Sequence, residues 1–187
     1  MSKLASDEIQ PEELILVESP AGATEGQLHF CGRTYACALG RSGIVASKHE
    51  GDGATPTGRF PLRALRYRAD RLAAPASKLS AHALRPDEGW CDAPDDPAYN
   101  RPVTRPYPAS HEALWRDDHL YDVVIMLGYN DDPVIPGMGS AIFFHLAKHV
   151  NGALQPTEGC VALVLADMLE VLASVTENTR MEIRLKP

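Results

Sequence analysis

The sequence Asp122-Val123-Val124-Ile125-Met126-Leu127 is a continuous apolar run behind one acidic residue. Such a run is typical of a buried β-strand. A second run of the same character, Ala141-Ile142-Phe143-Phe144-His145-Leu146, predicts another strand. Its polar member, His145, stands near the end of the run between two large apolar residues.

Outward from these two runs, shorter segments predict further strands. Met181-Glu182-Ile183-Arg184-Leu185 alternates apolar and polar residues as a terminal strand should. Four more strands are expected, over residues 14–17, 27–31, 33–39 and 60–65. Apolar residues at helical spacing predict a helix over residues 167–175, with Asp167 in the first turn, where negative charge is favoured. We therefore expect a mainly β domain with short helices, including one near the C-terminus.

Composition agrees with one loop-rich domain. The chain has 187 residues, of which 44% are hydrophobic, and it carries 15 prolines and 14 glycines. The formal net charge of -7 argues against nucleic acid or an anionic membrane as the main partner. The sequence contains no apolar run near the ~18 residues that a transmembrane helix needs.

The beginning of the sequence bears on compartment. Residues 1–13 are polar and acidic and predict a flexible arm ahead of a domain over residues 14–187. If Met1 is the native start, the acidic residues after Lys3 do not match a secretory signal, and we expect a cytoplasmic protein. In a reducing cytosol the four cysteines should be thiols.

Between the predicted strands, residues 70–110 are rich in proline and contain few apolar runs. We expect a long irregular loop there, packed rather than free because it contains Trp90 and Tyr99. Residues 110–115 are expected to form one or two helical turns.

The segment Pro156-Thr157-Glu158-Gly159-Cys160-Val161 is the sharpest chemical feature. A cysteine that follows glycine between a loop and an apolar run can be presented as a nucleophile, and nearby backbone N–H groups can hold an oxyanion. A thiol nucleophile needs a base, and His145 is the nearest candidate. The residues alone leave open that Cys160 is an inert core thiol and that His145 is a hydrogen-bonded core imidazole.

A zinc site formed by His145, His149 and Cys160 is a further alternative. Two histidines four residues apart face the same way on a helix, whereas this segment predicts a strand. The segment also lacks the glutamate that acts as general base in the helical zinc motif. We expect no metal and no cofactor.

Several segments together resemble the L,D-transpeptidase catalytic (YkuD) family. Phe144-His145-Leu146-Ala147 followed by Pro156-Thr157-Glu158-Gly159-Cys160-Val161 resembles the family's active-site signature, a histidine, a spacer and then Ser/Thr-x-Gly-Cys. Further resemblances, in the family's order, are found in Gly51-Asp52-Gly53-Ala54-Thr55-Pro56-Thr57-Gly58, in Trp90-Cys91-Asp92 with Pro97-Ala98-Tyr99-Asn100, and in Tyr121-Asp122 through Gly128-Tyr129-Asn130. The resemblance extends from about residue 25 to the C-terminus and favours the family's compact, single-domain branch.

The resemblance implies a YkuD-like β-sandwich with Cys160 as the nucleophile and His145 as its base. It also implies that the backbone carbonyl of Leu146 orients the histidine and that N–H groups near Gly159 and Cys160 stabilise the oxyanion. Thr157 matches the Ser/Thr position of the signature.

The sequence departs from the best-known members at two positions. Glu158 stands where they have histidine, and Ala162 stands where they have arginine or asparagine. Glu158 next to a thiolate should raise the pKa of Cys160. Glu158 is either a solvent-facing loop carboxylate or a group that binds a substrate amine.

The implied substrates are peptidoglycan-derived tetrapeptides or muropeptides in which diaminopimelate or lysine precedes D-Ala. In the cytoplasm we expect water to attack the acyl-enzyme, which gives an L,D-carboxypeptidase of wall recycling. An L,D-transpeptidase that uses an amine acceptor is one alternative. A muropeptide-binding module without catalysis is another.

Other substrate contacts are expected from residues near the motifs. Tyr129 and Asn130 follow the buried strand, and His149 follows the catalytic histidine. Substrate carboxylates call for cations. The available ones are Arg41, Lys48, Arg59, Arg101, Arg105 and His149.

Overall fold

The computed structural model describes residues 13–186, and the predicted arm lies, apart from Glu13, outside them. The fold is mostly β, with 40% strand and 6% helix, as the sequence predicts. Its elements are β1 (Leu14–Ser19), β2 (Glu25–Phe30), β3 (Arg33–Ala38), β4 (Ile44–Val45), β5 (Thr55–Pro56), β6 (Gly58–Tyr67), β7 (Ala81–Ala83), β8 (Glu88–Cys91), β9 (Pro102–Thr104), β10 (His111–Ala113), β11 (Val123–Leu127), β12 (Phe143–Leu146), β13 (His149–Val150), β14 (Ala153–Leu154), β15 (Val161–Leu163), α1 (Leu165–Ser174) and β16 (Arg180–Leu185).

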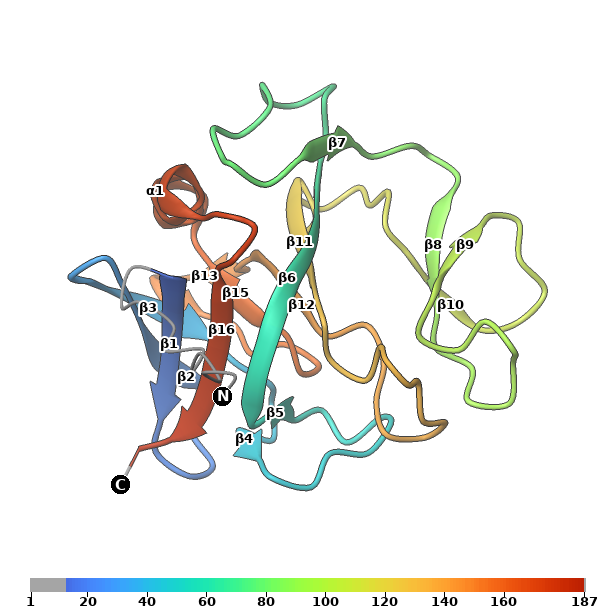
Figure 1. The fold of residues 1–187 in the computed structure, drawn as a ribbon, viewed down its shortest axis with the longest axis horizontal. Helices are drawn as coiled ribbons and strands as arrows, with labels where there is room; N and C mark the ends of the chain where they lie inside the picture. The colour runs from blue at the N-terminus through green and yellow to red at the C-terminus, as the bar shows by residue number, and fades with distance from the viewer. Residues whose placement is uncertain (1–12, 187) are drawn as a thin grey trace, which may run out of the picture.

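The main sheet has nine strands in the order β11-β12-β15-β3-β2-β1-β16-β6-β7, and β11 also pairs with β6. The long strand β6 pairs with β16 through its first half and with β11 through its second half. This double pairing closes the sheet into a sandwich-like barrel (Figure 1). Most neighbours are antiparallel, but three pairs run parallel: β12 with β15, β1 with β16, and β6 with β7.

The side chains of β11 alternate between two apolar clusters. Val123, Ile125 and Leu127 join the large cluster inside the barrel, which also contains the buried side of α1. Val124 and Met126 join a smaller cluster with Phe143. Both faces of this strand are therefore covered, which explains the unbroken apolar run in its sequence.

Helix α1 covers one end of the barrel. It buries Met168, Val171 and Leu172, and it carries Asp167 in its first turn, as predicted. An ion pair between Arg33 and Glu170 links the helix to β3.

The smaller cluster is covered by the segment that runs from β7 to β11. The strands β8, β9 and β10 form a separate three-stranded sheet, set apart from β1–β3 and α1 in Figure 1. The prediction of a long irregular loop over residues 70–110 therefore missed short strands. The predicted helical turns over residues 110–115 are wrong, because His111 to Ala113 pair with β8. Long-range pairing decides the conformation there, and local sequence does not reveal it.

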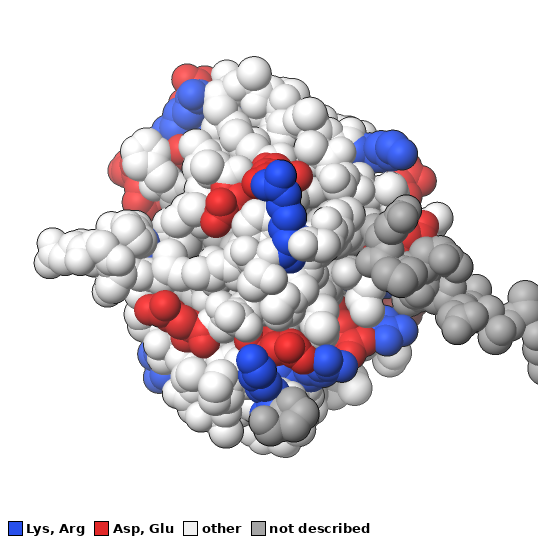
Figure 2. Space-filling model, turned by 90° about the vertical axis from the view of Figure 1, so that its left-hand side faces the viewer, with Lys and Arg blue, Asp and Glu red and all other residues white. Residues whose placement is uncertain are grey.

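Charges are mixed on the surface. Figure 2 shows one face, on which acidic and basic side chains lie near one another in small groups between broad uncharged areas. Within residues 13–186, no helix has the length and apolar character needed to cross a bilayer.

Candidate active site

Cys160 and His145 are brought together by two neighbouring parallel strands. His145 on β12 lies opposite Ala162 on β15. Cys160 stands two residues before Ala162, and side chains two residues apart along an extended chain point to the same face. The thiol and the imidazole therefore face the same way, and both line one cavity.

The ring of His145 is 4% exposed and is held from two sides. Nδ1 lies 2.8 Å from the carbonyl oxygen of Leu146, so Nδ1 donates and Nε2 keeps its lone pair in the neutral ring. Tyr121 packs edge-on against the ring, with centroids 5.1 Å apart. Burial lowers the pKa of His145 from 6.5 to about 4. Near pH 7 the ring is neutral and can accept a proton at Nε2.

Cys160 is buried, with 7% of the residue exposed. Sγ donates to the carbonyl oxygen of Ala141 and accepts from the N–H of Phe143, both at 3.3 Å. Burial and the nearby Glu112 carboxylate raise the pKa of Cys160 to about 12, against the opposing effects of the Phe143 N–H and of Lys48. A neutral thiol therefore stands with a neutral imidazole, and its proton has to leave as the sulfur attacks.

The turn before Cys160 is held by Thr157. Thr157 Oγ1 donates to the carbonyl oxygen of Cys160 at 2.7 Å and accepts from the N–H of Gly159 at 3.1 Å. Gly159 has φ 138°, and a Cβ there would lie 2.7 Å from the carbonyl oxygen of Ala54, so the position requires glycine. Because Thr157 uses the Gly159 N–H, we expect the Cys160 N–H, rather than that of Gly159, to bind an oxyanion.

The backbone of Thr157 ties this turn to the end of β3. Its N–H donates to Leu39 O, and its carbonyl oxygen accepts from the Arg41 N–H, both at 2.8 Å. Glu158 at the rim of the cavity has a side chain that is 78% exposed and pairs with Arg41 Nε at 2.8 Å. Glu158 thus faces solvent with a cationic partner, while Thr157 holds the turn before Cys160.

The cavity has a volume of about 480 Å³, enough for a short peptide segment. Four parts of the chain line it around Cys160 and His145. The part near β4 and β5 gives Lys48, Glu50 and Gly51, and the loop before β12 gives Ser140 and Ala141. The segment that covers the smaller cluster gives Asp92, Glu112, Arg116, Leu120 and Tyr121. The loop before Cys160 gives Pro156, Thr157 and Glu158.

A charged network surrounds the histidine side of the cavity. Tyr121 donates its hydroxyl to Glu112 Oε1 at 2.6 Å, and Arg116 lies 3.4 Å from the same oxygen. Arg116 also pairs with Asp118 at 2.7 Å and stacks over the ring of Tyr121. Burial raises the pKa of Glu112. The network fixes the Tyr121 ring that contacts His145.

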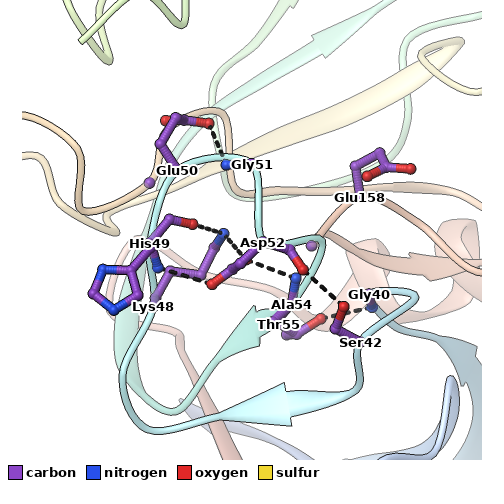
Figure 3. Close-up of polar contacts among 12 residues, drawn as sticks. Gly40, Ser42, Lys48, His49, Glu50, Gly51, Asp52, Ala54, Thr55 and Glu158 are labelled. Carbon is purple, nitrogen blue, oxygen red and sulfur yellow. Dashed lines mark hydrogen bonds and ion pairs between the residues drawn. The ribbon is translucent and has the colours of Figure 1, made fainter.

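A second part of the lining, which includes Lys48, is held in place by Asp52, as Figure 3 shows. Lys48 Nζ and the N–H groups of His49 and Ala54 all donate to its carboxylate. Burial opposes ionisation of Asp52, but these donors hold its pKa below the usual value. Nearby, Glu50 accepts from the hydroxyls of Tyr99 and Ser140.

Three predicted substrate-binding residues are not in the cavity lining. Tyr129 packs edge-on against Phe60, with ring centroids 5.5 Å apart, and donates its hydroxyl to Met138 O. Asn130, with φ 47°, uses its side-chain amide to hold the following loop through Ile135 and Gly139. His149 is exposed on the β13–β14 hairpin. Tyr129 and Asn130 therefore hold turns and pack against neighbouring residues, and none of the three side chains lines the cavity.

Sequence reasoning missed Glu50 of the lining, which stands just before the Gly51–Gly58 segment, and also Glu112 and Arg116. The last two are the harder cases. They stand in a segment without regular periodicity, so nothing in the local pattern singles them out. Asp92 and Tyr121 also line the cavity, and they belong to the segments that carry the family resemblance. That shared membership was the signal that could have identified them.

The zinc alternative finds no geometric support, because His149 lies outside the cavity that contains His145 and Cys160. In the described part of the chain, no three His, Cys, Asp or Glu side chains converge as metal ligands. All four cysteines are free thiols.

A family model described as the L,D-transpeptidase catalytic domain (YkuD) matches residues 26–183. The matched range contains Cys160, His145 and every other residue of the cavity lining. Neither the curated proteins nor the solved structures gave a match.

Proposed function

The chain belongs to the L,D-transpeptidase catalytic domain (YkuD) family, and from this premise we propose that it is a cysteine-dependent L,D-carboxypeptidase. The proposed reaction removes the terminal D-Ala from murein tetrapeptides. The observation that carries the proposal is the arrangement of Cys160 and His145 on adjacent strands, facing one peptide-sized cavity.

In the first half of the reaction, Cys160 Sγ attacks the carbonyl carbon before D-Ala while its proton passes to His145 Nε2. The oxyanion that forms accepts a hydrogen bond from the Cys160 N–H. The C–N bond then breaks, and His145 returns the proton to the departing amine of D-Ala. The product is a thioester between the shortened peptide and Cys160.

In the second half, water attacks the thioester. His145 takes a proton from the water, the C–S bond breaks and the thiol is restored. One water is consumed, and the products are a tripeptide and free D-Ala. Because Leu146 O holds Nδ1–H, the same Nε2 serves in both halves.

Water is the proposed acceptor because we also propose that the protein works in the cytoplasm. There the available substrates are soluble wall fragments rather than the cross-linked polymer. The exposed free thiol of Cys31 suits a reducing compartment. The proposed partners are therefore soluble peptides or muropeptides, not nucleic acid or membrane.

Mass spectrometry of the protein mixed with murein tetrapeptide, with and without an added D-amino acid, tests the proposal. We expect release of D-Ala that the added amine does not change, and no release by Cys160→Ala. Release by Cys160→Ala would overturn the role of the thiol. Cell fractionation tests the location, and recovery with the periplasmic fraction would contradict it.

The family itself favours a second candidate, an L,D-transpeptidase that uses an amine in place of water. Incorporation of the added D-amino acid in the same experiment would select it. A muropeptide-binding module is distinguished by a carbapenem, because an acyl adduct on Cys160 requires a working nucleophile. Folded protein without an adduct would favour the binding module.

A further inference from the structure

Lys48 is a buried cation in the wall of the cavity. Only 5% of its side chain is exposed, yet it lines the cavity together with Cys160. Its stem passes close to Gly139, where an added Cβ would lie 3.1 Å from Lys48 Cγ and 3.2 Å from Cε. The backbone thus leaves room for the lysine stem.

The ammonium of Lys48 is fixed in place and not fully used. Nζ donates to Asp52 Oδ1 at 2.5 Å and to the carbonyl oxygen of His49 at 3.0 Å (Figure 3). An ammonium has three donors, so one remains beyond these two. Burying an ammonium is costly unless its charge and donors are satisfied. An anionic ligand in the cavity would satisfy the third donor.

The neighbouring groups do not compete for that donor. Glu50 is engaged by three other donors: Oε2 accepts from the hydroxyls of Tyr99 and Ser140, and Oε1 accepts from the Gly51 N–H at 3.2 Å. Asp52 accepts from two backbone N–H groups besides Lys48.

The other cations around the cavity are engaged elsewhere. Arg116, on the histidine side, is held between Asp118 and Glu112. Arg41 at the rim is half exposed and pairs with Glu158. Lys48 is therefore the cation of the lining that combines burial with a donor left for a ligand.

We propose that Lys48 is a specificity-determining residue that binds a free carboxylate of the peptide, the one on the residue that leaves. This inference rests on the proposed function, because it names the part of the acyl donor that the cavity recognises. The substrate class becomes peptides with a free C-terminal carboxylate immediately after the scissile bond. Internal peptide bonds lack that carboxylate and are poor substrates.

The test compares two donors, the tetrapeptide ending in D-Ala and the same peptide ending in D-alaninamide. A hydrogen bond to a charged group contributes about 1.5–3 kcal/mol, so kcat/KM for the acid should exceed that for the amide by about 10- to 100-fold. The double substitution Lys48→Met/Asp52→Asn removes the ammonium without leaving its carboxylate partner buried. In this variant the ratio should fall to about 1, mainly through a higher KM for the acid.

The matched control removes a different ion pair in the same way. Arg59 and Glu182 pair at 2.5 Å on β6 and β16, outside the cavity lining. Arg59→Met/Glu182→Gln should keep the wild-type preference for the acid. If Lys48 only activated the thiol, its loss would slow both donors equally and leave the ratio unchanged. That result would overturn the inference.

A substrate-independent readout separates failure of this inference from failure of the proposed function. Iodoacetate carries a carboxylate and iodoacetamide does not, so their relative rates of alkylation at Cys160 report carboxylate binding beside the thiol. We expect Lys48→Met/Asp52→Asn to reduce the iodoacetate-to-iodoacetamide ratio by about 10-fold or more, as the loss of one charge-assisted hydrogen bond predicts. An unchanged ratio would refute carboxylate binding by Lys48 even if no peptide is cleaved. Equal cleavage of acid and amide by the wild-type protein would refute it while leaving the carboxypeptidase intact.

Discussion

Cys37 and Cys160 are both buried thiols, and burial raises the pKa of each to about 12. Cys37 on β3 points into the large apolar cluster inside the barrel. Cys160 lies at the edge of the smaller cluster, lines a cavity and shares a sheet face with His145. From this comparison we infer that burial alone leaves a thiol inert, whereas a nucleophile also needs access to a cavity and a neighbouring base.

The largest expected effect comes from removing each thiol in turn. Cys160→Ala should lower D-Ala release by at least about 1,000-fold, because the nucleophile is lost. Cys37→Ala should leave release unchanged and lower the free energy of unfolding by about 1–2 kcal/mol through the small cavity it creates. A D-Ala assay and urea unfolding of both variants measure these effects. A large loss of activity in folded Cys37→Ala would contradict the distinction between Cys37 as an inert thiol and Cys160 as the nucleophile.

Removing the base should have the next largest effect. His145→Gln keeps a polar side chain but cannot take the thiol proton, so kcat should fall by about 100- to 10,000-fold. Single-turnover formation of the Cys160 thioester is the measurement. The control is the rate at which Cys37 is alkylated in the unfolded His145→Gln variant, which should equal the rate in unfolded wild-type protein.

Acid should destabilise the protein through His145. Its pKa is about 4 in the fold and 6.5 ordinarily, so the unfolded chain binds the proton more readily. The free energy of unfolding should therefore decline as pH falls from 6.5 to 4, by up to about 3 kcal/mol from this group. His145→Gln should lack this part of the decline in urea titrations. An identical decline in both proteins would show that His145 has its ordinary pKa in the fold, as a solvent-exposed histidine does.

The Gly159 turn should be sensitive to a single methyl group. Gly159→Ala places Cβ against Ala54 O in a φ region unfavourable to alanine, and we expect a loss of about 1–3 kcal/mol of stability together with lower activity. Gly22→Ala is the matched control, since Gly22 has φ 74° and open space around its Cβ position. It should cost less in unfolding free energy and nothing in turnover.

The smallest expected effect is on the pH dependence of stability, and it should be the same for Cys37 and Cys160. The pKa of each thiol is 9 in the unfolded chain and about 12 in the fold. Below about pH 9 the thiol is protonated in both states, so its full contribution to stability is present only there. Above that pH, each thiol should lower the free energy of unfolding by about 1.4 kcal/mol per pH unit. Cys37→Ala and Cys160→Ala should each remove one such contribution between pH 9 and 10. Unequal contributions would show that the cavity admits water to Cys160.

The sequence predicted most of the barrel because its strands carry their own signals. The apolar runs before Leu127 and Leu146 need no long-range information, and neither does the spacing of Met168, Val171 and Leu172 in α1. The strands β8–β10 gave no such signal, because three- and four-residue strands depend on pairing with distant segments.

The candidate site, like the fold, was predictable only where the local sequence carries a signal. Cys160 and His145 stand in segments that resemble the family's active-site signature, so the sequence singled them out as candidates, and the structure places both in one cavity. Glu112 and Arg116 reach the cavity only because β10 pairs with β8 over the smaller cluster. Tyr129 and Asn130 were expected near the site because they end a buried strand, but their hydrogen bonds organise the loop between β11 and β12.

The double pairing of β6 has a consequence for association between molecules. A strand with an unpaired side offers its backbone to other chains and invites aggregation. In the part of the main sheet that the structure describes, ring closure leaves β7 as the terminal strand, and β7 is three residues long. So short a terminal strand offers another chain little backbone to pair with, and we expect this end of the sheet to contribute little to sheet-to-sheet association.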